Sequence, residues 1–202
     1  MSARDIVLER VRAALGPDPA TPEVPRHYRR AGEADARGSV VRFADRVEEY
    51  RASVHTCTEG ELGSLVRRLA ADDAVFVAAP AIAAALGLPG DEPPLSDPEL
   101  DAADVVVTGC ACAIATTGTI VLDGGPESGR RAISLIPDHH ICVVRAEQVL
   151  ADVPDAIAAL RDAADEGRPL TFVSGPSATS DIELERVEGV HGPRRLDVAL
   201  VR

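Results

Sequence analysis

Apolar residues recur near the start of the chain with the period of an α-helix. Between residues 5 and 15 they follow the spacing i, i+3, i+4, which predicts a short amphipathic helix ended by Gly16 and Pro17. Residues 17–38 are rich in Pro, Ala, Arg and Glu and lack apolar periodicity, which indicates an exposed arm. We therefore expect an N-terminal helix and exposed linker over residues 1–38, and one α/β domain over residues 39–202.

Beyond residue 39, short and almost fully apolar runs alternate with segments of helical periodicity. The pattern of residues 39–57 predicts a helix followed by a strand near Val54 to Cys57. Further helices are expected at residues 59–71, 81–87 and 147–167, where the last segment forms one helix or two, the second beginning at Asp152. The apolar runs predict strands at residues 74–80, 103–110, 119–125, 140–146, 169–177 and 194–202. Continuous apolar strands between helices are typical of an α/β fold, with an open, largely parallel sheet and helices on both faces.

Composition and charge exclude several classes of function. The net charge of −12 disfavours a nucleic-acid partner, because phosphates are neutralised by clustered cations. All 21 Lys and Arg residues are arginine, which excludes a Schiff-base lysine, a P-loop lysine and pyridoxal phosphate chemistry. No apolar run approaches the roughly 20 residues of a membrane span, and the N-terminus is unlike a secretory signal, so we expect a cytoplasmic protein.

Three Gly-Pro loops, at residues 124–131, 174–181 and 189–195, lie at or beside the ends of predicted strands. Loops at the carboxyl ends of strands in an open α/β sheet meet at one crevice, where ligands bind. Their glycine amides, hydroxyls and guanidiniums suit an anion, so the loops predict a shared phosphate or carboxylate site. The alternative is that the loops only make turns and their arginines are solvated. The groups concerned are Ser177, Thr179, Ser180, Arg130, Arg131, Arg194 and Arg195. Ser177 or Thr179 is also expected to cap a helix beginning near Asp181 and Ile182.

Cysteine and histidine residues offer weaker signals. Cys110, Cys112, His139, His140 and Cys142 could in principle hold zinc or iron, but no C-x-x-C pair exists, and we expect no metal and reduced thiols. A nucleophilic cysteine activated by His140 is equally disfavoured. The remaining candidates for acid–base chemistry are weak. They are Asp123, Asp138, His140 and His191, with a turn-forming role favoured for the two aspartates and left open for His191.

Three ordered blocks, "IATTGTIVLDGGPESGRRAISLIPDHHICVV", "FVSGPSATSDIE" and "GVHGPRRLDVALV", resemble the LUD-domain family, and in particular its lactate-utilisation protein C (YkgG-type) branch. The resemblance covers about residues 104–201. It implies a fold similar to the NagB/RpiA/CoA-transferase-like group. It also implies an accessory role in a complex that oxidises L-lactate to pyruvate, with the iron–sulfur clusters in partner subunits and no redox cofactor in this chain.

The resemblance also transfers individual residues. The family pattern falls on Thr117, Gly118, Thr119, Gly125, Pro126, Arg130, Pro137, Asp138, His140, Gly175, Pro176, Ser177, Thr179, Asp181, Ile182, Glu183, His191, Gly192 and Pro193. From these and the loop arginines, the expected ligand-binding residues are Thr117, Gly118, Thr119, Gly125, Arg130, His140, Gly175, Ser177, Thr179, His191 and Arg194.

The chain departs from the family pattern at two positions. Thr116 stands where the family usually has glutamate, and Ala178 stands where an arginine is common. The loss of a carboxylate and a cation favours a structural or ligand-sensing role over catalysis. The alternative is a free-standing enzyme of the CoA-transferase or sugar-phosphate-isomerase type that uses the same crevice.

Overall fold

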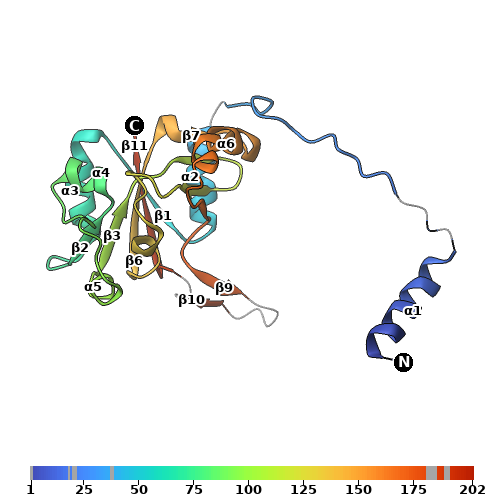
Figure 1. Ribbon diagram of the computed structural model, residues 1–202. Helices are drawn as coiled ribbons and strands as arrows, with labels where there is room; N and C mark the ends of the chain where they lie inside the picture. Colours follow the sequence, from blue (N-terminus) through green and yellow to red (C-terminus); the bar gives the residue numbers. More distant parts are fainter. Residues whose placement is uncertain (1, 18, 20–21, 37–38, 181–185, 189–191) are drawn as a thin grey trace.

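The core of the protein is a five-stranded parallel sheet with the strand order β1-β11-β6-β3-β2 (Figure 1). The computed structural model describes residues 2–17, 19, 22–36, 39–180, 186–188 and 192–202, and within residues 178–191 no side chain is described. The strands are β1 (Ser53–Cys57), β2 (Phe76–Ala78), β3 (Val105–Thr108), β6 (His139–Arg145) and β11 (Arg195–Val201). Each pairs in parallel with its neighbours, and Arg195 of β11 lies opposite His139 of β6.

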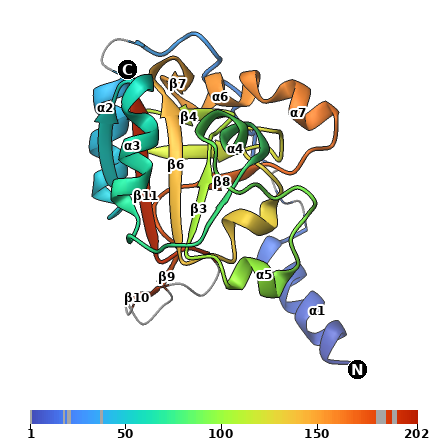
Figure 2. The same ribbon diagram turned by 90° about the vertical axis from the view of Figure 1, so that its left-hand side faces the viewer.

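Both faces of the central strands are buried, which explains why β3 and most of β6 and β11 are apolar. One face packs against α3 (Glu59–Leu69), α4 (Pro80–Leu86) and α5 (Asp97–Asp101), and Figure 2 shows α3 and α4 in front of the strands. Side chains alternate between the faces. Those on the α3 face include Val105, Val107, Ile141, Val143 and Ala199, whereas Cys142, Val144, Val198 and Leu200 lie on the other. The predicted α/β fold with a largely parallel sheet is confirmed.

The second face is covered by α2 (Ser39–Glu49) together with a smaller sheet that the sequence did not predict. Its strand order is β7-β4-β5-β8, formed by β4 (Cys112–Ile114), β5 (Thr119–Leu122), β7 (Val149–Leu150) and β8 (Thr171–Val173). β5 is antiparallel to both of its neighbours. Phe43 of α2 and Ile120 of β5 pack in the same cluster as β11. The outer side of the small sheet carries α6 (Val153–Ala159), with α7 (Arg161–Asp165) following it.

One local prediction needs correction. Residues 147–167 are helical only from Val153, where Asp152 caps α6; the preceding residues form a 3₁₀ turn (Ala146–Gln148) and β7. After Ser177 the chain forms β9 (Ala178–Ser180), which pairs antiparallel with β10 (Arg186–Glu188). The helix that Ser177 or Thr179 was expected to cap begins at residues 181–182, which lie outside the described residues.

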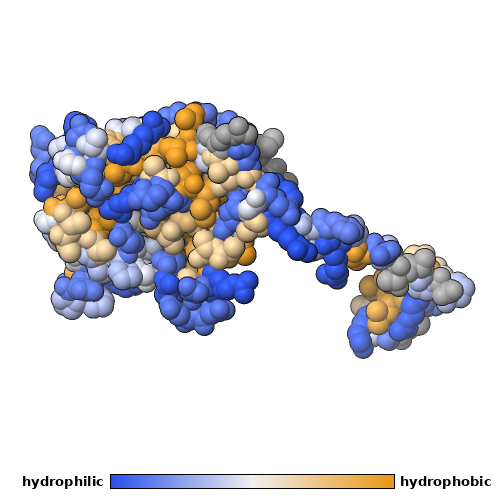
Figure 3. All heavy atoms as spheres, turned by 90° about the horizontal axis from the view of Figure 1, so that it is seen from above, coloured by the Kyte–Doolittle hydropathy of each residue, from blue (hydrophilic) through white to orange (hydrophobic). Residues whose placement is uncertain are grey.

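The N-terminal helix α1 (Ala3–Leu15) is separated from the rest of the molecule by extended chain (Figure 1). Ser2 and Asp5 form a capping box at its start, and none of its residues is buried. Apolar side chains therefore lie on its surface (Figure 3); Val7 is 59% exposed and Leu15 is 58% exposed. The arm contacts the domain at the start of α6, where Arg29 pairs with Asp152 and the Gly32 amide donates to Asp155 at 2.6 Å. Within the described residues, no helix combines the length and apolar character needed to cross a bilayer.

Candidate functional site

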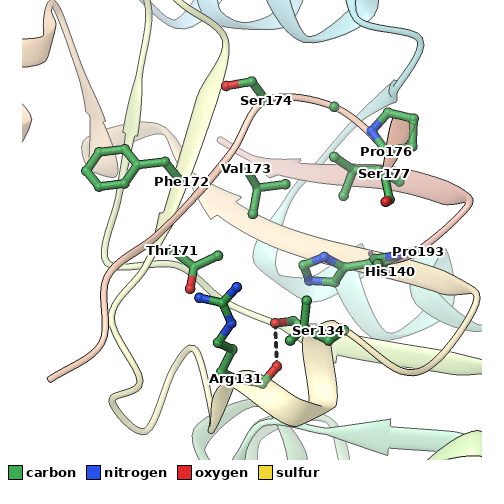
Figure 4. Close-up of a pocket in the computed structure, with 14 residues that line it drawn as sticks. Arg131, Ser134, His140, Thr171, Phe172, Val173, Ser174, Pro176, Ser177 and Pro193 are labelled. Carbon is green, nitrogen blue, oxygen red and sulfur yellow. Dashed lines mark hydrogen bonds between the residues drawn. The ribbon is translucent and has the colours of Figure 1, made fainter. Parts of the chain in front are cut away.

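A cavity of about 290 Å³ lies between the large and small sheets (Figure 4). Three segments form its wall: the 3₁₀ turn Arg131–Ser134, β8 with the following loop to Ser177, and Gly192-Pro193. His140 and Leu196 contribute from the first residues of β6 and β11. The cavity is therefore at the amino ends of β6 and β11 and at the carboxyl end of β8, whereas the sequence predicted a crevice formed by loops at carboxyl ends alone. The reason is that the turn and Gly192-Pro193 precede parallel strands, so both enter the sheet at its amino edge.

The charge in the cavity comes from Arg131. In Figure 4 its guanidinium points into the space between Thr171 and His140. The Arg131 side chain is exposed and makes no ion pair with a carboxylate among the described residues. None of the described lining residues is acidic. An unpaired cation in a hollow without carboxylates favours an anionic ligand.

Hydroxyl groups and apolar side chains complete the lining. The Ser134 hydroxyl donates to the Arg131 carbonyl at 3.1 Å, and Ser174 shares a 2.7 Å hydrogen bond with Thr119. Thr171 and Ser177 also line the cavity. The apolar lining residues are Leu135, Phe172, Val173, Pro176, Pro193 and Leu196. The wall is therefore about equally polar and apolar, and it combines an apolar surface with the polar groups that orient a small organic ligand.

His140 connects the cavity to a buried polar cluster. It is 2% exposed, and its Nε2 lies 2.8 Å from the hydroxyl of fully buried Thr108. The Thr108 hydroxyl also lies 3.7 Å from Cys142 Sγ. Hydrogen bonding with Cys110, followed by the influence of His140, lowers the pKa of Cys142 despite its burial. The same contact with Cys142, followed by burial, raises the pKa of Cys110 well above its usual value.

The structure brings only some of the predicted ligand-binding residues to the cavity. His140, Gly175 and Ser177 line it, and Thr119 is one hydrogen bond away through Ser174. The Ser177 amide donates to the Pro193 carbonyl at 2.8 Å, so two of the three Gly-Pro loops do meet. Gly175, with φ +100°, packs so closely on the Tyr50 carbonyl that a Cβ would lie 2.7 Å from it.

Four other predicted ligand-binding residues do not line the cavity and have structural roles outside it. Thr117 hydrogen-bonds Thr119 at 2.7 Å, and Gly118 packs against the α2 backbone. Arg130 donates from Nε and Nη2 to buried Asp91, at 2.5 and 2.9 Å. Gly125 belongs to the loop in which Asp123 pairs with Arg168.

Three further predicted ligand-binding residues, Thr179, His191 and Arg194, lie in the C-terminal part of the chain. Arg194 pairs with Asp138 at 3.3 Å on the surface, in a different hollow beside His139. Thr179 lies in β9, where its side chain is not described, and His191 lies outside the described residues. Asp138 thus lines a different hollow, whereas His140 lines the cavity.

Several residues that line the cavity were not among the ligand-binding residues predicted from the sequence. Ser134, Thr171 and Ser174 were not singled out, and Arg131 counted only as one of two neighbouring loop arginines. Ser174 directly precedes the Gly-Pro-Ser motif, which could have drawn attention to it. No group of three or more His, Cys, Asp or Glu side chains in the described part of the chain is arranged to hold a metal ion.

Thr116, the position that departs from the family pattern, does not line the cavity. Its hydroxyl donates to Asp152 at 2.8 Å, and Asp152 also accepts from the Val153 amide and pairs with Arg29 of the arm. The hydrogen bonds from Val153 and Thr116 lower the pKa of Asp152. A carboxylate is therefore present beside Thr116, supplied by the start of α6.

A second buried polar cluster lies at the amino edge of the large sheet. Asp197 of β11 is 1% exposed and accepts hydrogen bonds from His55 Nε2 and His139 Nε2, each at 2.7 Å. Arg195 Nε also lies 2.7 Å from Asp197. Burial raises the pKa of Asp197, but the bonds from His139 and His55 and the charge of Arg195 outweigh it and lower the pKa to about 2.

Comparison with known proteins places the chain in a family. The family model described as LUD domain matches residues 96–201. Lactate utilization protein C of Deinococcus radiodurans is 51% identical over 164 residues, which are 79% of this chain and 77% of that protein. Lactate utilization protein C of Shouchella clausii is 35% identical over 98 residues, 47% of this chain and 42% of the relative, so the match spans less than half of that longer protein. The crystal structure of a DUF162 family protein from Deinococcus radiodurans is similar with a TM-score of 0.72 at 41% identity, covering 83% of this chain and 99% of that one. The chain belongs to the LUD-domain family.

Proposed function

We propose that this protein acts in lactate utilisation, as the subunit without iron–sulfur clusters in a complex that oxidises L-lactate to pyruvate. Support comes from relatives named lactate utilization protein C, one of which is 51% identical over 77% of its length. The four cysteines are all buried and free, and no C-x-x-C pair occurs in the sequence. The iron–sulfur clusters of the complex accordingly belong to partner subunits.

The molecular contribution that we propose is the binding of a small carboxylate in the 290 Å³ cavity. The observation that carries this proposal is the Arg131 guanidinium, which points into the cavity and has no carboxylate partner among the described residues. The carboxylate of the ligand pairs with Arg131, and the hydroxyl or keto oxygen of the ligand accepts a hydrogen bond from the Thr171 hydroxyl. A ligand hydroxyl can also donate to Ser134 Oγ, whose own proton goes to the Arg131 carbonyl. The apolar part packs against Leu135 and neighbouring side chains. The volume is at the small end of the range of ligand pockets, about 300–1,000 Å³, which favours a small acid.

The lining supports binding more than turnover. Acid–base chemistry on a hydroxy acid or sugar phosphate uses a positioned base, and none of the described lining residues is a carboxylate. The chain has no lysine, and the Nε2 atom of His140 is engaged with Thr108. Turnover of acyl-CoA or sugar phosphates by the isolated chain would contradict this assignment and favour an enzyme.

Ligand binding is tested by isothermal titration calorimetry of the purified protein with L-lactate, pyruvate and inorganic phosphate as separate probes. We expect a carboxylate to bind, and Arg131→Gln to weaken it at least about tenfold, because hydrogen bonds to a charged group contribute roughly 1.5–3 kcal/mol. Arg161→Gln on exposed α7 is the matched control and leaves the affinity unchanged. Binding of phosphate alone would identify a phosphate-bearing ligand, and equal affinity of the Arg131 variant would refute the site.

The role in lactate oxidation is tested in cells. Deletion of the gene abolishes growth on L-lactate as the sole carbon source but not on pyruvate, and the intact gene restores it. Affinity purification of the tagged chain co-purifies proteins with iron–sulfur clusters, detected by their visible absorbance. Unchanged growth on L-lactate would refute the role, and purification of the chain alone would refute the complex.

A further inference from the structure

The two nitrogens of the His140 ring have different surroundings. His140 is 2% exposed and lines the cavity, and because its neighbour Ile141 packs on the α3 face, the His140 ring lies on the face towards the small sheet. Nε2 lies 2.8 Å from the buried Thr108 hydroxyl. Nδ1 has no hydrogen-bond partner among the described residues and retains accessible surface. Since His140 is otherwise buried, the space that Nδ1 reaches is the cavity.

A chain of hydrogen bonds behind the ring favours the neutral form that carries its proton on Nε2. The Thr108 hydroxyl donates to Cys142 Sγ at 3.7 Å, and Cys142 Sγ donates to the Gly109 carbonyl at 3.6 Å. A hydroxyl has a single proton, so Thr108 accepts its hydrogen bond from His140 Nε2–H, and Nδ1 keeps a lone pair. In the opposite arrangement Thr108 would donate to Nε2, and its bond to Cys142 would be lost.

The charge of Arg131 favours the same tautomer. Its guanidinium points into the space between Thr171 and His140 (Figure 4), and none of the described lining residues is acidic. A nitrogen lone pair that faces a cation is favoured over an N–H group directed at it, because the N–H dipole would present its positive end to the positive charge. The cavity therefore presents a hydrogen-bond acceptor at His140 Nδ1.

Ser134 provides a second acceptor in the cavity wall. Its hydroxyl proton goes to the Arg131 carbonyl at 3.1 Å, which leaves the lone pairs of the Ser134 oxygen for a ligand. The hydroxyl of a 2-hydroxy acid donates to such an acceptor, whereas the keto oxygen of a 2-keto acid can only accept. A keto oxygen placed against Nδ1 would set two acceptors against each other and leave both without a hydrogen bond, which weakens binding.

We propose that His140 selects 2-hydroxy acids over 2-keto acids in the cavity, and that Thr108 positions it by fixing its tautomer. The 2-hydroxyl of the ligand donates to His140 Nδ1 while the ligand carboxylate pairs with Arg131. This inference rests on the carboxylate site proposed above and adds the group that distinguishes the two kinds of acid. His140 acts here in recognition, and no covalent bond forms or breaks. L-Lactate is expected to bind at least about fivefold more tightly than pyruvate.

The test is isothermal titration calorimetry at pH 8 with L-lactate and pyruvate as separate probes, and the quantity compared is the ratio of their Kd values. His140→Gln reaches Thr108 with its side-chain amide but places no acceptor at the Nδ1 position, so the ratio falls to about 1. Thr108→Val releases the tautomer and lowers the ratio, whereas Thr108→Ser keeps the hydroxyl and preserves it. His27→Gln on the exposed arm is the matched control and leaves the ratio unchanged. Circular dichroism verifies that each variant is folded.

A second measurement needs only the wild-type protein. Long-range ¹H–¹⁵N NMR spectra of the ligand-free chain, with the His140 ring assigned through bonds to its backbone, identify the ring nitrogen that carries the proton. We expect the proton on Nε2, and a proton on Nδ1 would overturn the proposal.

The outcomes separate this inference from the carboxylate site on which it rests. Binding of neither acid would overturn both. Binding of both acids that depends on Arg131 but shows equal affinities would overturn the selection by His140 and leave the site intact. A preference for L-lactate that persists in His140→Gln would likewise assign the selection to another group.

Discussion

Replacing Asp197 with asparagine tests whether the buried carboxylate stabilises the sheet through its three donors. In the wild type, Asp197 is 1% exposed and bonds His55, His139 and Arg195. Its pKa falls from 3.8 to about 2 on folding, and at about 1.4 kcal/mol for each pKa unit this corresponds to about 2.5 kcal/mol. Asp197→Asn is therefore expected to lower the free energy of unfolding at pH 7 by about 2.5 kcal/mol, and Tm by roughly 5–10 °C for a domain of this size.

The same argument predicts a pH dependence. The folded-state pKa lies below the unfolded value, so the contribution of Asp197 is fully present above pH 3.8 and is lost as the pH falls from 3.8 towards about 2. The difference in stability between wild type and Asp197→Asn should accordingly be constant from pH 5 to 7 and shrink below pH 4. Asp138→Asn is the matched control, because Asp138 also pairs with an arginine but is 65% exposed, and it should change stability by less than about 0.5 kcal/mol.

The assay is urea denaturation followed by far-ultraviolet circular dichroism, since the chain has no tryptophan to report unfolding by fluorescence. Each variant is measured between pH 3 and pH 7, and the slope of unfolding free energy against urea is compared with that of the wild type. Equal stability of Asp197→Asn and wild type at pH 7 would refute the reasoning. A difference that stays the same at pH 3 and pH 7 would show that the carboxylate charge is not its source.

Three further predictions use the same denaturation assay. Gly118→Ala should lower the free energy of unfolding by about 2–4 kcal/mol, because φ is +60° and the added Cβ would lie 2.7 Å from the α2 backbone. Gly167→Ala is the control: φ is +71° but the space around it is open, so the loss should be only about 1–2 kcal/mol, and equal losses would contradict the packing argument. Arg130→Met should lower the free energy of unfolding by about 3 kcal/mol, because the Asp91 carboxylate stays buried without its cation. The double variant with Asp91→Leu should recover much of this loss of stability, and no recovery would argue against an uncompensated charge. Deleting residues 1–16 should change the stability of the domain by less than about 0.5 kcal/mol, because α1 buries no side chain, and a larger loss would reveal a contact between α1 and the domain.

The sequence by itself determined the large sheet. The central strands are recognisable because a strand buried on both faces is apolar at most positions, and this property belongs to the segment whatever surrounds it. The predicted apolar runs at residues 103–110 and 194–202 contain β3 and β11, and the run at residues 140–146 overlaps β6, which begins one residue earlier at His139. The small sheet was harder to predict, because β4 and β7 have only three and two residues and owe their conformation to pairing with neighbouring strands.

Only the tertiary structure decided which of the chemically similar residues form the candidate site. Arg130 and Arg131 are adjacent in the sequence, yet Arg130 is held by Asp91, 39 residues away, while Arg131 points into the cavity. Cys110 and Cys112 are two residues apart, yet Cys110 packs in the cluster between the two sheets and Cys112 packs in the cluster under α6. A local pattern specifies residue types and backbone preference, whereas the partner of a charged side chain is chosen by packing between distant segments. For that reason the fold followed from the apolar pattern, and the anion cavity did not.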